Sequence, residues 1–233
     1  MGSTRNDVAE GLHPVRVWDW PTRLFHWALV ACIVGLVVTG QIGGTAMAWH
    51  FRLGYVVLSL LLFRLVWGFV GGHWSRFAVF VRSPATIAAY LRGQKTPEME
   101  AGHNPLGALS VLALLTAALV QAGSGLFSDD DIMNAGPLAH LVGSDWVSLA
   151  TAVHTRFNKF TLLALVALHI GAIVFYRVVK RNNLVQAMVS GDKELDVPVP
   201  PSQDGWQRRL LALALFFGLM SAVWFAAERL GRL

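Results

Sequence analysis

Residues Val147–Tyr176 read VSLATAVHTRFNKFTLLALVALHIGAIVFY, an apolar run with few charges. A helix needs about 20 residues to cross the hydrocarbon core of a bilayer, so this run is long enough to span a membrane and also to protrude or tilt. It contains two histidines, His154 and His169. An imidazole is costly in a membrane unless it has a partner, and both side chains are therefore candidates for a functional site.

Four further stretches share this apolar character and are long enough to span. They are Leu24–Gln41, Phe51–Val70, Leu106–Phe127 and Leu210–Ala227. The 233 residues are 55% hydrophobic and only 14% charged, which is too little charge for the polar shell of a water-soluble domain. Only helices and closed barrels satisfy the backbone in lipid, and the alternation typical of strands is absent. The sequence therefore predicts an all-α integral membrane protein, with a four-helix transmembrane bundle and a fifth, C-terminal transmembrane helix.

The segments between the spans alternate in charge. Three of them hold thirteen of the nineteen lysines and arginines: Arg5, Arg16, Arg23, Arg76, Arg82, Arg92, Lys95, Arg177, Lys180, Arg181, Lys193, Arg208 and Arg209. The segment between the third and fourth spans has none of them and carries Asp129, Asp130, Asp131 and Asp145. By the positive-inside rule the N-terminus is cytoplasmic and the C-terminus is periplasmic. The formal net charge of +5 is then a signal of topology and not the footprint of a nucleic-acid partner.

Two more histidines, His26 and His50, stand at the starts of the first and second spans. The predicted topology places His26 near the cytoplasmic face and His50 near the outer face. Fifteen residues, or about 22 Å of helix, separate His154 on the outer side from His169 deeper toward the cytoplasm. They also differ by roughly 60° in azimuth at about 100° per residue, so they share a broad helix face. Depth therefore pairs His26 with His169 and His50 with His154.

Each pair suits a planar metal cofactor that takes one nitrogen ligand from either side. Ligation by two imidazoles leaves a haem iron without an open position, which favours one-electron transfer over oxygen or substrate chemistry. The single cysteine, Cys32, and the absence of a CxxCH motif exclude a haem attached in the c-type manner. Three arginines near the pairs are candidates to neutralise haem propionates. They are Arg52 and Arg156, each two residues from an outer histidine, and Arg64 near the cytoplasmic end of the second span.

Other interpretations stand beside this one. A histidine at a helix end is commonly an interfacial residue, and Arg64 can simply snorkel to the interface. His103, in the motif GHNP at the start of the third span, is expected to cap that helix or to lie at the interface rather than to ligate. A haem-free transporter or assembly subunit would use the histidines to pass protons or metal ions. The pairing by depth counts against that function.

Several motifs resemble the bacterial cytochrome b561 and nickel-iron hydrogenase b-type cytochrome family. The stretch VRVWDWPTRLFHW, which ends just after His26, resembles the opening of the family. Three later stretches also resemble patterns of the family: WHFRLGY at Trp49–Tyr55, GHNPLG at Gly102–Gly107, and Leu162–Tyr176. Residues 181–193 resemble the family's cytoplasmic tail. In the family, the two histidines of the fourth span lie fourteen residues apart, whereas here they lie fifteen apart. Either His154 departs from the ligand pattern or the helix contains a local bulge.

The resemblance implies a di-haem membrane domain over 15–193, preceded by a cytoplasmic segment, 1–14, and followed by a linker, 194–209, and a transmembrane helix, 210–233. It further implies two haem b groups, one on each histidine pair, in the bacterial inner membrane. Electrons would pass between the quinone pool and a redox partner such as a hydrogenase or a c-type cytochrome. An alternative is a quinone-coupled superoxide oxidase, with an outer basic patch of Arg52, Arg156 and Lys159. The resemblance says little about the fifth helix.

Overall fold

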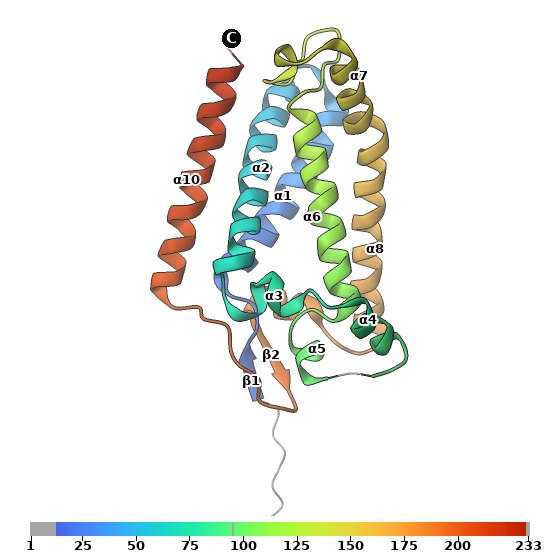
Figure 1. Ribbon diagram of the computed structural model, residues 1–233, viewed down its shortest axis with the longest axis vertical. Coiled ribbons are helices and arrows are strands. Elements are labelled where there is room, and N and C mark those ends of the chain that lie inside the picture. Colours follow the sequence, from blue (N-terminus) through green and yellow to red (C-terminus); the bar gives the residue numbers. More distant parts are fainter. Residues whose placement is uncertain (1–12, 95, 232–233) are drawn as a thin grey trace, which may run out of the picture.

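The computed structural model of the protein describes residues 13–94 and 96–231, and five long helices run along its longest axis (Figure 1). They are α1 (Trp20–Ile42), α2 (Met47–Val70), α6 (Pro105–Gly125), α8 (Asn158–Val178) and α10 (Trp206–Leu230). All five are long and apolar enough to cross a membrane, which confirms the five predicted spans. Their bounds differ from the predicted ones by about a turn or less, except that the fourth predicted span also includes most of α7 (Ser144–Ala152) and the turn Val153–Phe157 before α8. Of the predicted N-terminal segment, only residues 13 and 14 lie in the described part.

The starts of the helices follow local rules. The Asp19 side chain accepts a hydrogen bond from Thr22 N at 2.8 Å and begins α1, and Asn104 accepts one from Gly107 N at 2.7 Å and begins α6. A proline follows within the first turn of each helix, where its missing N–H is not needed. The capping role that the sequence suggested for His103 therefore belongs to Asn104, because a short side-chain carbonyl reaches the free amide of the first turn.

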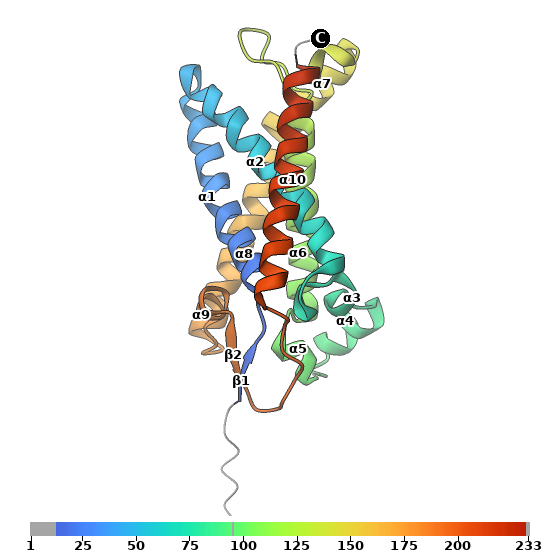
Figure 2. The same cartoon turned by 90° about the vertical axis from the view of Figure 1, so that its left-hand side faces the viewer.

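The long helices pack side by side, α1 on α2, α2 on α6, and α6 on α8. Helix α10 lies outside this four-helix bundle, chiefly against α2 and also against α1, and both views show it there (Figure 2). The core is built largely by α2, with Leu61, Phe63 and Trp67 almost fully buried. Large apolar side chains cover the outside of the bundle, as at Val34, Leu168 and Phe217, which are more than half exposed. An apolar surface of this extent suits lipid and not water.

The connections gather at two ends of different charge. One end, here called the basic end, consists of β1 (His13–Arg16), α3 (Phe77–Phe80), α4 (Pro84–Leu91), α5 (Pro97–Ala101), α9 (Leu184–Ser190), β2 (Asp192–Leu195) and the turn η2 (His73–Ser75). The opposite, acidic end contains the turn η1 (Gly44–Ala46), residues 126–143 with the turn η3 (Ala139–Leu141), and α7 (Ser144–Ala152). Figure 1 shows β1 and β2 below the bundle and α7 above it. The alternation of charge predicted along the chain is thus an alternation in space.

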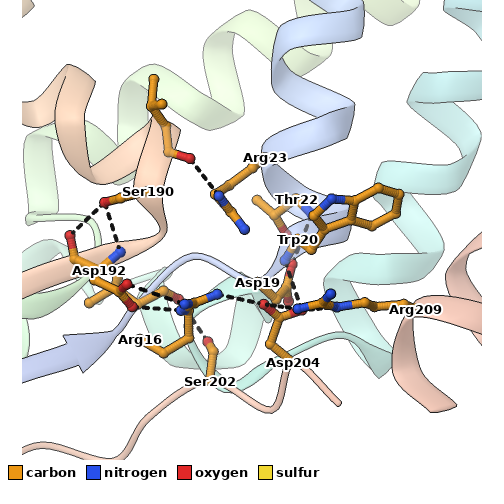
Figure 3. A network of polar contacts seen from close by, with 12 residues as sticks. Arg16, Asp19, Trp20, Thr22, Arg23, Ser190, Asp192, Ser202, Asp204 and Arg209 are labelled. Atoms are coloured by element: carbon orange, nitrogen blue, oxygen red, sulfur yellow. Dashed lines mark hydrogen bonds and ion pairs between the residues drawn. The ribbon is translucent and has the colours of Figure 1, made fainter. Parts of the chain in front are cut away.

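Strands β1 and β2 form an antiparallel ribbon that was not predicted from the sequence. Arg16 lies opposite Asp192 in the ribbon and binds its carboxylate at 2.6 Å (Figure 3). Arg16 also binds Asp204, which in turn accepts hydrogen bonds from Arg209 and from Trp20 N. Burial raises the pKa of Asp204, but the hydrogen bonds from Arg209, Trp20 N and Arg16 outweigh burial and hold the pKa below its ordinary value. The segment before α10 is therefore fastened to the start of α1.

A buried carboxylate, Asp19, fastens α1 to α2 at the basic end. Its oxygens accept hydrogen bonds from four groups, and no part of the residue is exposed. The donors are Thr22 N, Trp67 Nε1, Gly72 N and Ser75 Oγ, at 2.8 to 3.3 Å. A Cβ at Gly72 would lie 2.4 Å from Asp19 Oδ2, so only glycine permits this approach of the backbone. Every donor around the carboxylate is matched, which indicates a structural role for Asp19.

Candidate functional site

The four histidines meet in two pairs inside the bundle. The rings of His26 on α1 and His169 on α8 have centroids 6.5 Å apart. The rings of His50 on α2 and His154, just before α8, have centroids 6.1 Å apart. These are the pairs predicted from depth. We call His26 and His169, which lie toward the basic end, the inner pair, and His50 and His154, toward the acidic end, the outer pair.

The separations within the pairs fit a metal ion between the rings. An imidazole nitrogen lies about 2 Å from a metal and about 1 Å from its own ring centroid, so two ligands place their centroids about 6 Å apart. A direct hydrogen bond between two rings would bring the centroids to about 5 Å. The described residues contain no group of three or more His, Cys, Asp or Glu that could hold a bare metal ion. Two protein ligands at each site therefore suit a cofactor that supplies the other ligands itself.

Both outer histidines are held in the orientation that ligation requires. His50 Nδ1 donates to Leu36 O of α1 at 3.1 Å, and His154 Nδ1 donates to Gln121 O of α6 at 2.8 Å. Because a carbonyl only accepts, each Nδ1 carries the proton and each Nε2 keeps its lone pair for a metal. Hydrogen bonds of this kind fix the ring and raise the basicity of a ligand.

Small residues and a cavity lie beside the outer pair. A cavity of about 140 Å³ is lined by both outer histidines and by small residues of α2 and α6, among them Gly54, Ala122 and Gly125. A Cβ at Gly125 would lie 2.8 Å from His154 Cε1. A Cβ at Gly40 of α1 would lie 3.3 Å from His50 Cε1. Glycine thus allows both rings to pack closely on neighbouring helices, and the residues present fit the proposed group.

The segment Val153–Phe157 between α7 and α8 is a π-helical turn that includes His154. A π-turn accommodates one more residue than an α-helical turn. Of the two alternatives that the fifteen-residue spacing left open, the local bulge is therefore present. It places the His154 ring opposite His50, so the extra residue does not remove His154 from its pair.

Two amide side chains, neither of them predicted from the sequence, stabilise this turn. Gln121 Nε2 donates to the backbone carbonyl of His154 at 2.8 Å. Asn158 Nδ2 donates to Gln121 Oε1 at 2.9 Å and to Ala117 O at 2.8 Å. These bonds join α6 to the bulge and satisfy a carbonyl that the π-turn displaces. The signal in the sequence was an amide in an otherwise apolar span, at the depth of a histidine.

The inner pair has different surroundings. His26 Nδ1 is buried and has no hydrogen-bond partner within the described residues. Arg64 of α2 is only 3% exposed and places its guanidinium 5.0 Å from the centroid of the Phe77 ring. This burial contradicts the alternative that Arg64 snorkels to the interface. The ring of His103 packs against Trp18 with centroids 4.6 Å apart. Burial, together with the charges of Arg64, His169 and Lys193, lowers the pKa of His103 to about 3.

Arg52, Arg156 and Lys159, here called the outer cations, lie close in sequence to the outer histidines and toward the surface. Arg52 and Arg156 are exposed. The Arg52 guanidinium lies over the Trp49 ring at 5.0 Å, and Lys159 Nζ lies over the Phe160 ring at 5.1 Å. Both contacts are with aromatic side chains close by in the sequence. Their roles in binding a cofactor or a substrate stay predictions.

The sequence is similar to those of several known proteins. Residues 17–191 match the family model described as prokaryotic cytochrome b561. A probable Ni/Fe-hydrogenase B-type cytochrome subunit of Bradyrhizobium diazoefficiens is 26% identical over 80% of the chain and 88% of that protein. A protein of the same description from Azotobacter vinelandii is 30% identical over 76% of the chain and 87% of its own length. The probable Ni/Fe-hydrogenase 1 B-type cytochrome subunit of Escherichia coli K12 is 30% identical over 48% of the chain and 60% of that protein. No solved structure gives a significant match.

Proposed function

The chain belongs to the prokaryotic cytochrome b561 family, and on that basis we propose that it binds two haem b groups and passes electrons between the quinone pool and a hydrogenase. Membership in the family implies haem b and a multi-pass membrane protein. The observation that carries the di-haem proposal is the separation of 6.1 and 6.5 Å within the two histidine pairs. In the proposal, His26 and His169 hold one haem and His50 and His154 hold the other.

A haem held by two imidazoles has no open iron position, and what it supplies is the exchange of single electrons. The protein supplies ligands of fixed orientation. At the outer pair, the carbonyls of Leu36 and Gln121 fix the two rings. The two pairs lie about 22 Å apart along the fourth span, which is most of the roughly 30 Å hydrocarbon core. Two one-electron groups in series at this spacing suit electron transfer from one face of the membrane to the other.

We propose a hydrogenase as the partner because the relatives are described as probable Ni/Fe-hydrogenase B-type cytochrome subunits. A c-type cytochrome is the other partner that the resemblance allows. Quinone is proposed because it is a redox carrier that dissolves in the same bilayer. The gathering of the basic segments at one end supports an orientation with that end in the cytoplasm of the bacterial inner membrane. In this orientation the outer pair and the acidic end face the periplasm.

The test uses the full chain purified in detergent. We expect two b-type haems per chain, two one-electron components in a redox titration, and reduction of both by a hydrogenase under hydrogen with onward transfer to a quinone. His140→Ala, at an exposed histidine outside the pairs, is the control and should keep both haems. A wild-type protein without haem would refute the proposal. Reduction by superoxide, and not by a hydrogenase, would favour the superoxide oxidase instead.

Gln121→Leu is expected to weaken cofactor binding at the outer pair alone. The variant removes the hydrogen bond to the His154 carbonyl and the acceptor of Asn158, so the π-turn that aims His154 loses its support. Loss of such a supporting partner typically lowers the affinity for a metal group by about 10–100-fold. The measurement is the haem content after dilution or a competing apoprotein. Thr116→Val, at an exposed threonine of the same helix, is the matched control and should bind both haems as the wild type does.

A further inference from the structure

Buried nitrogens without partners are concentrated in one half of the molecule. Within residues 13–94 and 96–231, the side-chain nitrogens of this kind are Arg23 Nε, His26 Nδ1, Arg64 Nη1, Arg76 Nε, Arg82 Nε and His103 Nδ1. All of them lie toward the basic end, and none belongs to the outer pair. Native structures leave few buried polar groups unmatched, and each one needs an explanation such as a ligand or an ion. Two of these nitrogens, Arg64 Nη1 and His103 Nδ1, are available to bind a group that accepts hydrogen bonds.

Arg64 and His103 approach the same aromatic ring from two segments of the chain. The Arg64 guanidinium lies 5.9 Å from the centroid of the Phe80 ring, and the His103 ring lies 4.7 Å from it. His103 also feels the charges of Arg64 and His169, which lower its pKa. Arg64, His103 and the inner pair are thus electrostatic neighbours.

The position of Arg64 on α2 also places it close to the inner pair. Arg64 is fourteen residues beyond His50, which corresponds to about 21 Å along the helix and about 40° around it. It therefore lies on nearly the same face of α2 as the outer ligand His50. Its depth is that of the inner pair, because His154 and His169 are separated by a similar length of helix.

Among residues 13–94 and 96–231, no carboxylate forms a hydrogen bond with Arg64. Asp19 is the carboxylate whose charge reaches Arg64, but its oxygens already accept hydrogen bonds from the four donors described above, in α1, α2, η2 and the connection between α2 and η2. Lys193 adds a second partly buried cation nearby, and its Nζ donates to the backbone carbonyl of Glu100. A buried charge without a bonded counter-ion is costly. An anion at this place would lower that cost.

We propose that Arg64 Nη1 and His103 Nδ1 together bind one carboxylate of the cofactor held by His26 and His169, namely a propionate of the inner haem. The inference rests on the proposed function and adds a binding residue, His103, for which the sequence alone had indicated a capping or interfacial role. The guanidinium fork of arginine matches the geometry of a carboxylate. A neutral imidazole provides one N–H donor. Arg64 and His103 together thus offer one positive charge and two hydrogen-bond donors to the negatively charged carboxylate.

The first test is a redox titration of the holoprotein in which the inner haem is identified as the component that is absent from His169→Ala. In Arg64→Met we expect the ratio of reduced to oxidised inner haem, at a fixed potential, to fall about tenfold, or about 59 mV for one electron. Removing a cation and leaving a carboxylate unpaired both favour the more positive, oxidised iron. His103→Phe should shift the same haem in the same direction by less. The outer haem should stay unchanged in both variants.

Conservative variants allow the same test if Arg64→Met or His103→Phe prevents the protein from accumulating. Arg64→Lys keeps the charge and should recover most of the potential, and His103→Asn keeps a donor and should do the same. Arg52→Met removes an exposed cation from the other end and should leave the inner haem unchanged. If both haems are present and Arg64→Met and His103→Phe leave the inner potential unaltered, the carboxylate site is refuted while the di-haem proposal stands. A protein without any haem would instead refute the proposed function.

A second arm distinguishes a propionate from an anion of the solvent. The wild-type apoprotein is reconstituted with haem and with haem dimethyl ester, whose propionates carry no charge. We expect the ester to bind the inner site at least about tenfold more weakly than haem in the wild type, and about as well as haem in the double variant Arg64→Met, His103→Phe. Equal binding of haem and ester by the wild type, with a potential that instead shifts on adding inorganic phosphate, would show a free anion in the pocket and overturn the assignment.

Discussion

Replacing His169 with alanine is expected to reduce the haem content of the protein from two groups per chain to one. His26 faces His169 with ring centroids 6.5 Å apart, so the variant leaves the inner site with one protein ligand. The outer pair lies about 22 Å away along the fourth span and should keep its haem. The measurement is the haem count per chain, together with a redox titration that shows one component in place of two.

Four further variants serve as controls for the loss of haem in His169→Ala. Leu168→Ala changes the preceding residue, which is 69% exposed, and should keep both haems. His26→Ala should remove the same redox component as His169→Ala, and His50→Ala and His154→Ala should both remove the other one. If His169→Ala and His50→Ala abolish the same component, the pairing is wrong.

Replacing Asp19 with leucine is expected to destabilise the fold strongly. The carboxylate accepts from Thr22 N, Trp67 Nε1, Gly72 N and Ser75 Oγ, and none of these donors could reach solvent around a fully buried residue. An unmatched buried donor costs about 1–3 kcal/mol, so the loss for the set is about 3 kcal/mol or more. For a chain of this size that corresponds to a fall of about 10 °C in Tm. Thermal unfolding in detergent, followed by circular dichroism, measures it.

Two further variants locate the cause of this effect. Asp19→Asn keeps one acceptor oxygen and should fall between the wild type and the leucine variant. Asp192→Ala removes a carboxylate whose side chain is 44% exposed and which binds Arg16 at the surface, and it should change stability by less than about 1 kcal/mol. A Tm of Asp19→Leu equal to that of Asp192→Ala would show that the buried hydrogen bonds do not hold α1 to α2.

Where a residue could be placed by position along a helix, the sequence was sufficient. His26 and His169 could be paired from the sequence alone, because depth follows from the rise per residue and from the side of the membrane. The bulge at His154 was signalled by a spacing one residue longer than that of the family. The antiparallel pairing of β1 with β2 was not predictable in the same way, because its two short strands lie at opposite ends of the bundle domain in sequence.

The sequence by itself determined that the protein has five stretches long and apolar enough to cross a membrane and that its four histidines fall at two depths. Apolar length, charge alternation and helical rise are properties that can be read along the chain. The tertiary structure decided which groups surround the histidines. That Gln121 supports the turn of His154, that Asp19 matches four donors, and that Arg64 and His103 share one aromatic neighbour are contacts between separate segments of the chain. Such contacts depend on how each helix is rotated about its axis. That rotation is fixed only when the side chains of the whole bundle pack together.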